Sequence, residues 1–243
     1  MARVEGVSFE QILNQEDFIL IDTNVLSCIF SDSYRDKIYP AKKFLDLDER
    51  LLENVNEGTK LVGLWVREPK IHTTTKVSEE FEQFVDILNH KLKMLNWYEK
   101  SKRSNLKRDY YHGDMSPVRQ QELMEEICWR YQTILKILKK SIYRPEENRV
   151  FKVLERMILE LSEYSGVKND LRDERIMIPK KYEDLHADEQ LIAVSVYLST
   201  IKNTSSAIIT ADSDIEKILK KTMELLFDFG TREGNVMLAS LLD

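Results

Sequence analysis

The chain has 243 residues, of which 42% are hydrophobic and 32% are charged. This composition excludes collagen-like, low-complexity and intrinsically disordered chains, and it supplies enough apolar residues for one large core or two modest ones. With 36 basic against 42 acidic residues, the net charge of -6 disfavours a protein that binds nucleic acid over its whole surface. We therefore expect any nucleic-acid partner to be recognised locally.

The cysteine content and the N-terminal segment bear on the compartment. Cys28 and Cys128 form no Cys-x-x-Cys motif, so we expect two small buried residues in a reducing compartment, with no disulfide framework and no zinc site. The N-terminus lacks the apolar stretch of a secretory signal. The longest apolar run, residues 191–198, is far shorter than the roughly 20 residues that cross a bilayer. These features predict a cytoplasmic protein with no membrane partner.

Short β-rich runs alternate with helical patterns along much of the chain. We predict strands at residues 18–22, 71–75 and 207–210, with a fourth candidate at residues 223–229. The first and third runs are continuously apolar, which is typical of strands buried on both faces. The alternation predicts an α/β architecture with a largely parallel central sheet flanked by helices.

A long helical segment, residues 86–185, interrupts this alternation. Apolar residues recur at steps of three and four over residues 123–138 and 151–161, and Pro145 suits the first turn of the second helix. We therefore predict one domain over residues 1–243 with a helical insertion or subdomain inside it. The two apolar stripes predict either packing within one chain or a dimer face.

Four acidic residues are predicted at the carboxyl ends of strands or in the first turns of helices. They are Asp22, Glu80, Asp188 and Asp212. In doubly wound sheets ligand sites form beyond the carboxyl ends of the strands, so this topology would bring the four to one rim.

Each of these acids has an ordinary structural alternative. An Asp near a helix start is often only a cap, and Asp188 fits either interpretation. We expect Asp212 to lie outside its helix without a capping role, because Ser213 and Glu216 form a capping box. Glu79 competes with Glu80 and Glu189 with Asp188, and we prefer Glu80 because a hydrophobic residue follows it.

Carboxylates gathered at one place need a counter-charge. Two of them about 4 Å apart repel by roughly 4 kcal/mol at an effective dielectric near 20. No Lys or Arg stands beside Asp22, Asp188 or Asp212, and Lys76 is the only cation immediately near Glu80. Mg²⁺ and Mn²⁺ prefer oxygen ligands of this kind, lower the pKa of a bound water and polarise phosphoryl oxygens. The pattern therefore predicts a divalent metal site.

The motifs that hold these acids are Asp22-Thr23-Asn24, Val77-x-x-Glu80-Phe81, Asp188-x-x-Leu191-Ile192-Ala193 and Ile209-Thr210-x-Asp212-x-Asp214. In order and approximate spacing, over residues 17–85 and 185–230, they resemble the PIN-domain nucleases. The resemblance implies a three-layer fold and a metal-dependent endoribonuclease. The residues that it implies as ligands of Mg²⁺ or Mn²⁺ are Asp22, Glu80, Asp188 and Asp212, with Asp214 as an additional acid. The residues that it implies as supports for those acids or contacts to RNA are Thr23, Asn24 and Thr210. A homodimer and an inhibitor or antitoxin protein are candidate partners.

One basic stretch, residues 89–112, holds seven Lys and Arg against two acidic residues, interleaved with aromatic residues. Phosphate neutralisation and base stacking predict contact with single-stranded RNA, and the alternative is a solvated helix end. The cations that we expect to bind RNA are Lys102, Arg103, Lys107 and Arg108. A non-catalytic PIN-like module and a DNA-directed nuclease stay open as alternatives. No P-loop, Rossmann glycine motif, zinc pattern or nucleophile elbow is present in the sequence.

Overall fold

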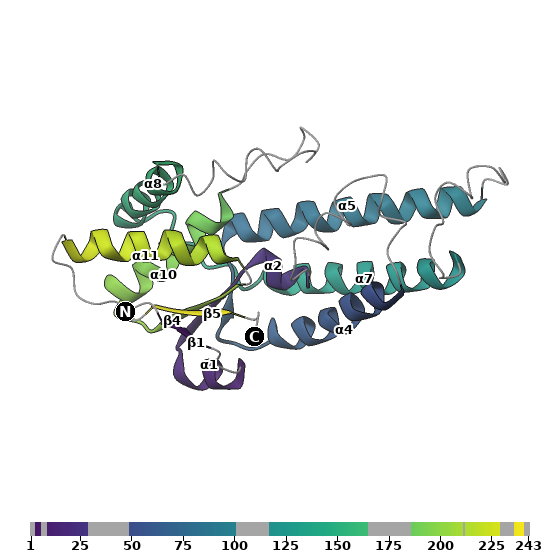
Figure 1. Ribbon diagram of the computed structural model, residues 1–243, viewed down its shortest axis with the longest axis horizontal. Coiled ribbons are helices and arrows are strands. Elements are labelled where there is room, and N and C mark those ends of the chain that lie inside the picture. The colour runs from purple at the N-terminus through teal and green to yellow at the C-terminus, as the bar shows by residue number, and fades with distance from the viewer. Residues whose placement is uncertain are drawn as a thin grey trace.

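The computed structural model describes residues 3–5, 9–28, 49–100, 117–164, 186–210, 212–228 and 236–240. The molecule is elongated and mostly helical, with a five-stranded sheet at one end and long helices projecting from it (Figure 1). The strands are β1 (Arg3–Glu5), β2 (Phe18–Ile21), β3 (Ile71–His72), β4 (Ser206–Thr210) and β5 (Val236–Ser240).

The sheet has the order β1-β5-β4-β2-β3, and each neighbouring pair is parallel. β2 and β4 are apolar and buried along almost their whole length, as expected for strands covered on both faces. The prediction of an α/β chain with a parallel sheet flanked by helices is confirmed at this level. From β2 the chain proceeds to β3 on one side, and from β4 to β5 on the other, so the topological switch point lies between β2 and β4.

The predicted strand at residues 71–75 is shorter than expected. Only Ile71–His72 form β3, and Thr73 makes an isolated bridge to Ile142. Thr74 then caps the next helix, because its Oγ1 accepts a hydrogen bond from the backbone N–H of Val77 at 3.2 Å.

The fourth candidate strand, at residues 223–229, is wrong. Met223 to Asp228 belong to helix α11 (Ser213–Asp228). The buried residues of α11 recur at helical steps, and they are Ile215, Ile218, Leu219, Thr222 and Met223. β1 and β5, which form one edge of the sheet, were not predicted.

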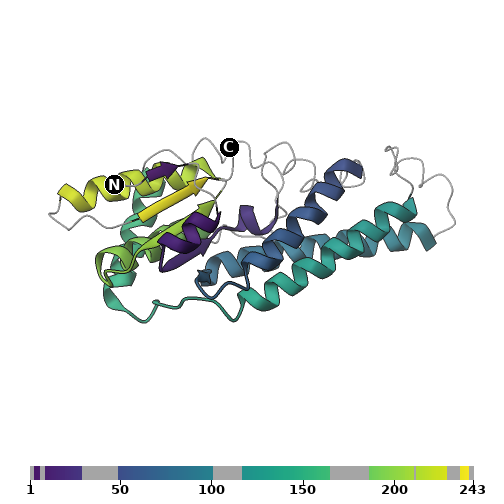
Figure 2. The ribbon, with the colours of Figure 1, turned by 90° about the horizontal axis from the view of Figure 1, so that it is seen from below.

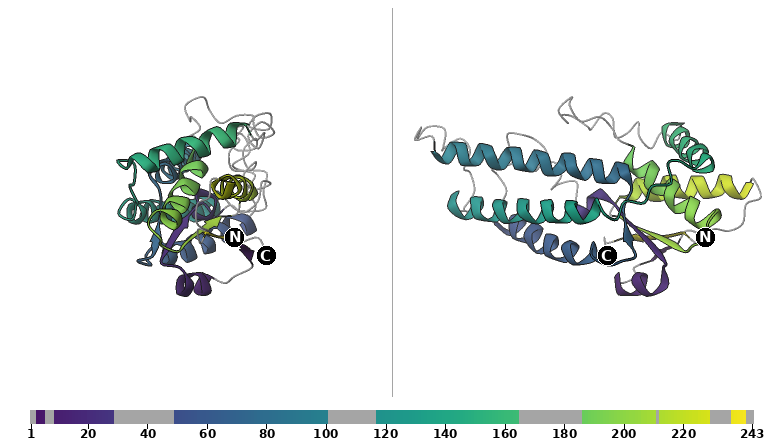
Figure 3. Two further views of the ribbon diagram at one scale, coloured as in Figure 1. Left: turned by 90° about the vertical axis from the view of Figure 1, so that its left-hand side faces the viewer. Right: turned by 180° about the vertical axis from the view of Figure 1, so that it is seen from behind.

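The other helices are α1 (Phe9–Gln15), α2 (Thr23–Leu26), α4 (Glu49–Trp65), α5 (Thr75–Lys100), α7 (Pro117–Leu138), α8 (Arg149–Tyr164) and α10 (Ala187–Thr200). Helices α8, α10 and α11 lie together on one side of the sheet, and α1 lies on the other (Figures 1 and 3). α10 is buried nearly all round because it is enclosed by β4, α5, α8 and α11. No helix in the described part of the chain is both long and apolar enough to cross a membrane.

Helices α4, α5 and α7 form a bundle that extends away from the sheet, with α7 packed against both of the others (Figure 2). In its interior, Tyr131 of α7 makes edge contacts with Phe81 and Phe84 of α5, at ring-centroid distances of 5.7 and 5.3 Å. The bundle therefore includes α4, which precedes the predicted insertion at residues 86–185. The described part of that segment divides between the bundle and α8, which packs beside the sheet.

Helix α8 does not begin at Pro145, which was predicted in its first turn. The helix begins at Arg149, and Asn148 caps it by accepting hydrogen bonds from the backbone N–H groups of Val150 at 2.9 Å and Phe151 at 3.3 Å. Pro145 lies in the turn before the cap.

The bundle contacts the sheet end through the turn after α2. Tyr131 donates its hydroxyl hydrogen bond to the carbonyl oxygen of Ser27, and Gly58 of α4 lies against Cys28. Cys28 has a positive φ of 56°, and a Cβ at position 58 would lie 2.9 Å from the Cβ of Cys28. Cys28 and Cys128 are both buried free thiols, as predicted.

Candidate functional site

The four predicted acids gather around the switch point of the sheet. Asp22 directly follows β2, and its backbone N–H continues the ladder to β4 by donating to the carbonyl oxygen of Ile209 at 3.1 Å. Thr210 ends β4, and Asp212 follows two residues later. Ligands of doubly wound sheets bind at this kind of position, beyond the carboxyl ends of the strands.

Asp22 is the most enclosed of the four, with 1% of its surface exposed. Its Oδ2 accepts hydrogen bonds from the hydroxyl of Thr210 at 2.7 Å and from the amide of Asn24 at 3.3 Å. It occupies the cap position of α2 but makes no side-chain capping bond. Helix capping therefore does not account for this buried carboxylate.

The side chain of Asp212 makes one contact with its own helix and one with Asn24. Because α11 begins at Ser213, Asp212 is the cap residue, and its Oδ1 accepts from the backbone N–H of Asp214 at 2.8 Å. The expectation that a capping box from Ser213 leaves Asp212 without a capping role is wrong. Its Oδ2 lies 3.5 Å from the Asn24 amide nitrogen that also binds Asp22. One asparagine thus bridges the two aspartates.

Glu80 reaches the site from the second turn of α5. Its Oε2 accepts a hydrogen bond from the hydroxyl of Thr23 at 2.6 Å. Its neighbour Glu79 is exposed to solvent. The structure brings Glu80, and not Glu79, to the other acids.

Asp188 reaches the site from the first turn of α10. The cap position of that helix is His186, which has a φ of 54°, so Asp188 is not the cap. The neighbouring Glu189 is 1% exposed, and its Oε1 accepts from the hydroxyl of Ser162 at 2.6 Å. Of these two adjacent acids, Asp188 belongs to the candidate site and Glu189 ties α10 to α8.

Burial and mutual repulsion raise the pKa values of two of these acids. Burial raises the pKa of Asp22 to about 7 against an ordinary 3.8, with further contributions from Glu80 and Asp212, while the Thr210 hydrogen bond opposes the shift. Burial also raises the pKa of Asp188, and the charges of Asp22, Asp212 and Glu80 add to it. The leading causes of both shifts are burial and the neighbouring carboxylates, opposed at Asp22 by hydrogen bonds.

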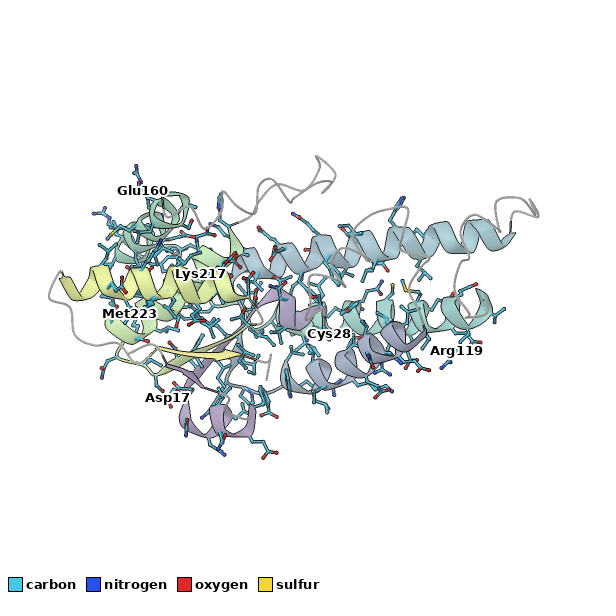
Figure 4. All side chains as sticks on the ribbon, in the orientation of Figure 1. Asp17, Cys28, Arg119, Glu160, Lys217 and Met223 are labelled. Carbon is cyan, nitrogen blue, oxygen red and sulfur yellow. The ribbon has the colours of Figure 1, made fainter. Side chains whose placement is uncertain are left out.

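Asp214 adjoins Asp212 through its backbone N–H, but its side chain pairs with a cation. The Oδ1 of Asp214 lies 2.7 Å from the Nζ of Lys217, which Figure 4 labels on α11. The four acids without Asp214 therefore form the candidate ligand set. The predicted RNA-binding residues Lys102, Arg103, Lys107 and Arg108 lie outside the described residues.

The donor chemistry at the switch point suits a hard divalent cation. Carboxylate oxygens from four segments share one negatively charged environment, and hydroxyl and amide groups hold Asp22, Glu80 and Asp212 in place. Across the described ranges, no three His, Cys, Asp or Glu side chains meet at metal-ligand spacing. The four acids therefore lie around a common region, but their oxygen atoms are not positioned to coordinate one ion together.

No known protein family, curated protein or solved structure matches the chain.

A polar network next to the acids was not predicted. Gln190 of α10 is 3% exposed, and its Oε1 accepts from the backbone N–H of Lys76 at 2.8 Å. Its Nε2 donates to the Oε1 of Glu155 at 3.2 Å, and the same oxygen pairs with the Nζ of Lys76 at 3.1 Å. The three residues come from three helices distant in sequence, so no local pattern links them.

Proposed function

We propose that this protein is a metal-dependent endoribonuclease with a PIN-like fold. The observation that carries the proposal is the gathering of Asp22, Glu80, Asp188 and Asp212 at the switch point of a parallel sheet, where burial and then the neighbouring carboxylates raise the pKa values of Asp22 and Asp188. Buried carboxylates that repel one another are costly for a protein without a bound cation to offset them. A divalent ion supplies that charge and the chemistry of phosphodiester hydrolysis.

The residues that would hold Mg²⁺ or Mn²⁺ are Asp22, Glu80, Asp188 and Asp212. When bound, such an ion lowers the pKa of a coordinated water and polarises a phosphoryl oxygen of the substrate. The chain orients the ligands: Thr210 and Asn24 bind the Oδ2 of Asp22, and Thr23 binds the Oε2 of Glu80. Support of this kind fixes the direction of a ligand's free lone pairs.

The raised pKa of Asp22, about 7, has a consequence for metal binding. A carboxylate must lose its proton to bind a cation, so protons compete with the metal below that pH. We therefore expect metal affinity to rise as the pH increases from 6 to 8.

Cleavage of labelled single-stranded RNA, compared with DNA of the same sequence, tests the proposal. We expect internal cleavage of RNA with Mg²⁺ or Mn²⁺ and none with EDTA. Asp22→Asn and Glu80→Gln should each lower the rate by about a thousandfold, because losing a metal ligand removes several kcal/mol of transition-state stabilisation. The matched control is Glu79→Gln, one residue away and exposed, which should cleave like the parent.

The outcomes separate the proposal from its alternatives. Preferential cleavage of DNA would identify a DNA-directed nuclease instead. Thermal unfolding with and without millimolar Mn²⁺ distinguishes a non-catalytic module, because a ligand that binds only the native state must raise its stability. No shift with Mn²⁺ and no cleavage of either substrate would contradict the nuclease proposal.

A further inference from the structure

Lys76 stands in a position from which it could neutralise the acid site. It lies on α5 four residues before Glu80, and residues with this spacing are neighbours on one face of a helix, where oppositely charged side chains commonly pair. If the ammonium group of Lys76 paired with Glu80, it would neutralise part of the negative charge that attracts a divalent cation to the site.

The structure pairs Lys76 with a different carboxylate. Its Nζ lies 3.1 Å from the Oε1 of Glu155 on α8, and the two side chains are only 29% and 22% exposed. The same Glu155 oxygen accepts from the Nε2 of Gln190 at 3.2 Å.

Gln190 fixes this arrangement from the other side. Its buried amide also accepts from the backbone N–H of Lys76 at 2.8 Å, so the lysine is held at its backbone and at its side chain by one network. The network joins α5, α8 and α10. The first and the last of these helices carry Glu80 and Asp188.

We propose that Glu155, oriented by Gln190, holds Lys76 away from Glu80 and so preserves the negative charge of the acid site for a divalent cation. Glu155 and Gln190 act as positioning residues, since they influence the site through Lys76 and bind no metal or substrate themselves. The inference rests on the proposed metal site, and it adds three residues that control the strength of that site.

A purely structural ion pair between α5 and α8 would give a different mutational pattern. If the pair only joined the helices, removing either partner would loosen the site alike. In the proposed arrangement the two partners have opposite effects on metal affinity. Removing Glu155 alone frees Lys76 to pair with Glu80 and weakens metal binding. Removing Lys76 does not weaken it, and Glu155 is no longer needed once Lys76 is absent. The sign of the Lys76 effect therefore distinguishes the two roles.

The test measures Mn²⁺ affinity from the electron paramagnetic resonance signal of free Mn²⁺, with the full chain. Glu155→Gln keeps the shape of the side chain but removes its charge, and it should weaken Mn²⁺ binding about tenfold as Lys76 turns toward Glu80. Lys76→Met should bind Mn²⁺ as well as the parent or more tightly. The double variant should return to within about twofold of the parent.

Glu160→Gln is the matched control. Glu160, labelled in Figure 4, lies five residues further along α8 and pairs with Arg156 at 3.0 Å. It has the same change of charge on the same helix, and its Mn²⁺ affinity should equal that of the parent.

Unchanged binding by Glu155→Gln, or a double variant as weak as Glu155→Gln alone, would overturn the inference. If Glu155→Gln does not fold, as judged by thermal unfolding in EDTA, Lys76→Met decides alone, since weaker binding by that variant overturns it. A parent protein that binds no Mn²⁺, or binds it equally after Asp22→Asn, would instead contradict the metal site and the proposed function with it.

Discussion

Carboxylates have opposite surroundings in the acid site and in the helical bundle. In the bundle, Glu82 pairs with Lys139 at 2.6 Å, and a hydrogen bond from Arg130 lowers the pKa of Glu126. At the sheet end, burial and neighbouring carboxylates raise the pKa values of Asp22 and Asp188. In the bundle, cationic partners therefore stabilise the charged form of these two carboxylates, whereas at the sheet end the surroundings of Asp22 and Asp188 disfavour it.

A large expected effect of a single substitution tests whether the bundle is stabilised by packing. Tyr131→Ala should lower the free energy of unfolding by about 4 kcal/mol, because it removes a side chain that is 1% exposed and in contact with Phe81 and Phe84. Urea unfolding measures it. Tyr131→Phe keeps the ring and removes the hydroxyl that donates to Ser27, at a cost of about 1 kcal/mol. A loss below about 1.5 kcal/mol for the alanine variant would show that packing at Tyr131 is not decisive.

The next effect tests the cost of charge at the acid site. The folded-state pKa of Asp22 is about 7 and its ordinary value is 3.8, so the folded chain keeps a proton that the unfolded chain has released. Its contribution to stability is therefore greatest below pH 4, falls by up to about 1.4 kcal/mol per pH unit between these values, and is fully lost above pH 7.

Unfolding by urea from pH 4 to 8, in EDTA, measures this slope against the Asp22→Asn variant. The difference between the two proteins isolates Asp22 from the other titrating groups. We expect the variant to be the more stable of the two at pH 8. Parallel pH profiles would show that Asp22 is not destabilised by its surroundings.

A smaller effect tests the hydroxyl that supports two aspartates. Thr210 donates to the Oδ2 of Asp22 and accepts from the backbone N–H of Asp212 at 2.9 Å. Thr210→Val should cost about 1–2 kcal/mol in the free energy of unfolding at pH 8, because it leaves buried polar groups without these bonds. Thr222→Val is the control, since this equally buried hydroxyl bonds only within its own helix, to Ile218. Equal losses would remove any special role for Thr210.

The smallest effect tests the ion pairs of the bundle. Lys139 and Glu82 are 46% and 45% exposed, and solvent screens such pairs, so Lys139→Ala should change the free energy of unfolding by less than about 0.5 kcal/mol. Chemical denaturation at two salt concentrations checks it. A loss above about 1 kcal/mol would mean that the bundle depends on its surface charges as well as on its interior.

Much of the sheet end was predictable because its signals are local. β2 and β4 are short apolar runs, and each ends in the polar residues that meet at the switch point. The sequence did not predict β5, because five residues of apolar and small side chains do not distinguish a strand from a helical turn. The prediction of a candidate strand at residues 223–229 was wrong, because the helical spacing of apolar residues in α11 is visible only over a longer stretch of sequence.

The site was predictable only as far as its acids. Their position at strand ends and helix starts indicated that they would meet, and the capping alternative failed for Asp22 and Asp188 but held in part for Asp212. The network of Lys76, Glu155 and Gln190 depends on how α5, α8 and α10 pack together. No spacing along the chain encodes that packing, so only the structure shows it.

The contact between Gly58 and Cys28 limits how the chain could be divided. It sets α4 against the turn that follows Thr23 and Asn24, the residues that hold Glu80, Asp22 and Asp212. Any larger residue at position 58 would push on that turn, because its Cβ would fall 2.9 Å from the Cβ of Cys28. A foreign bundle grafted in its place would therefore have to reproduce this close approach, because α4 packs directly on the turn next to the residues that support the carboxylates.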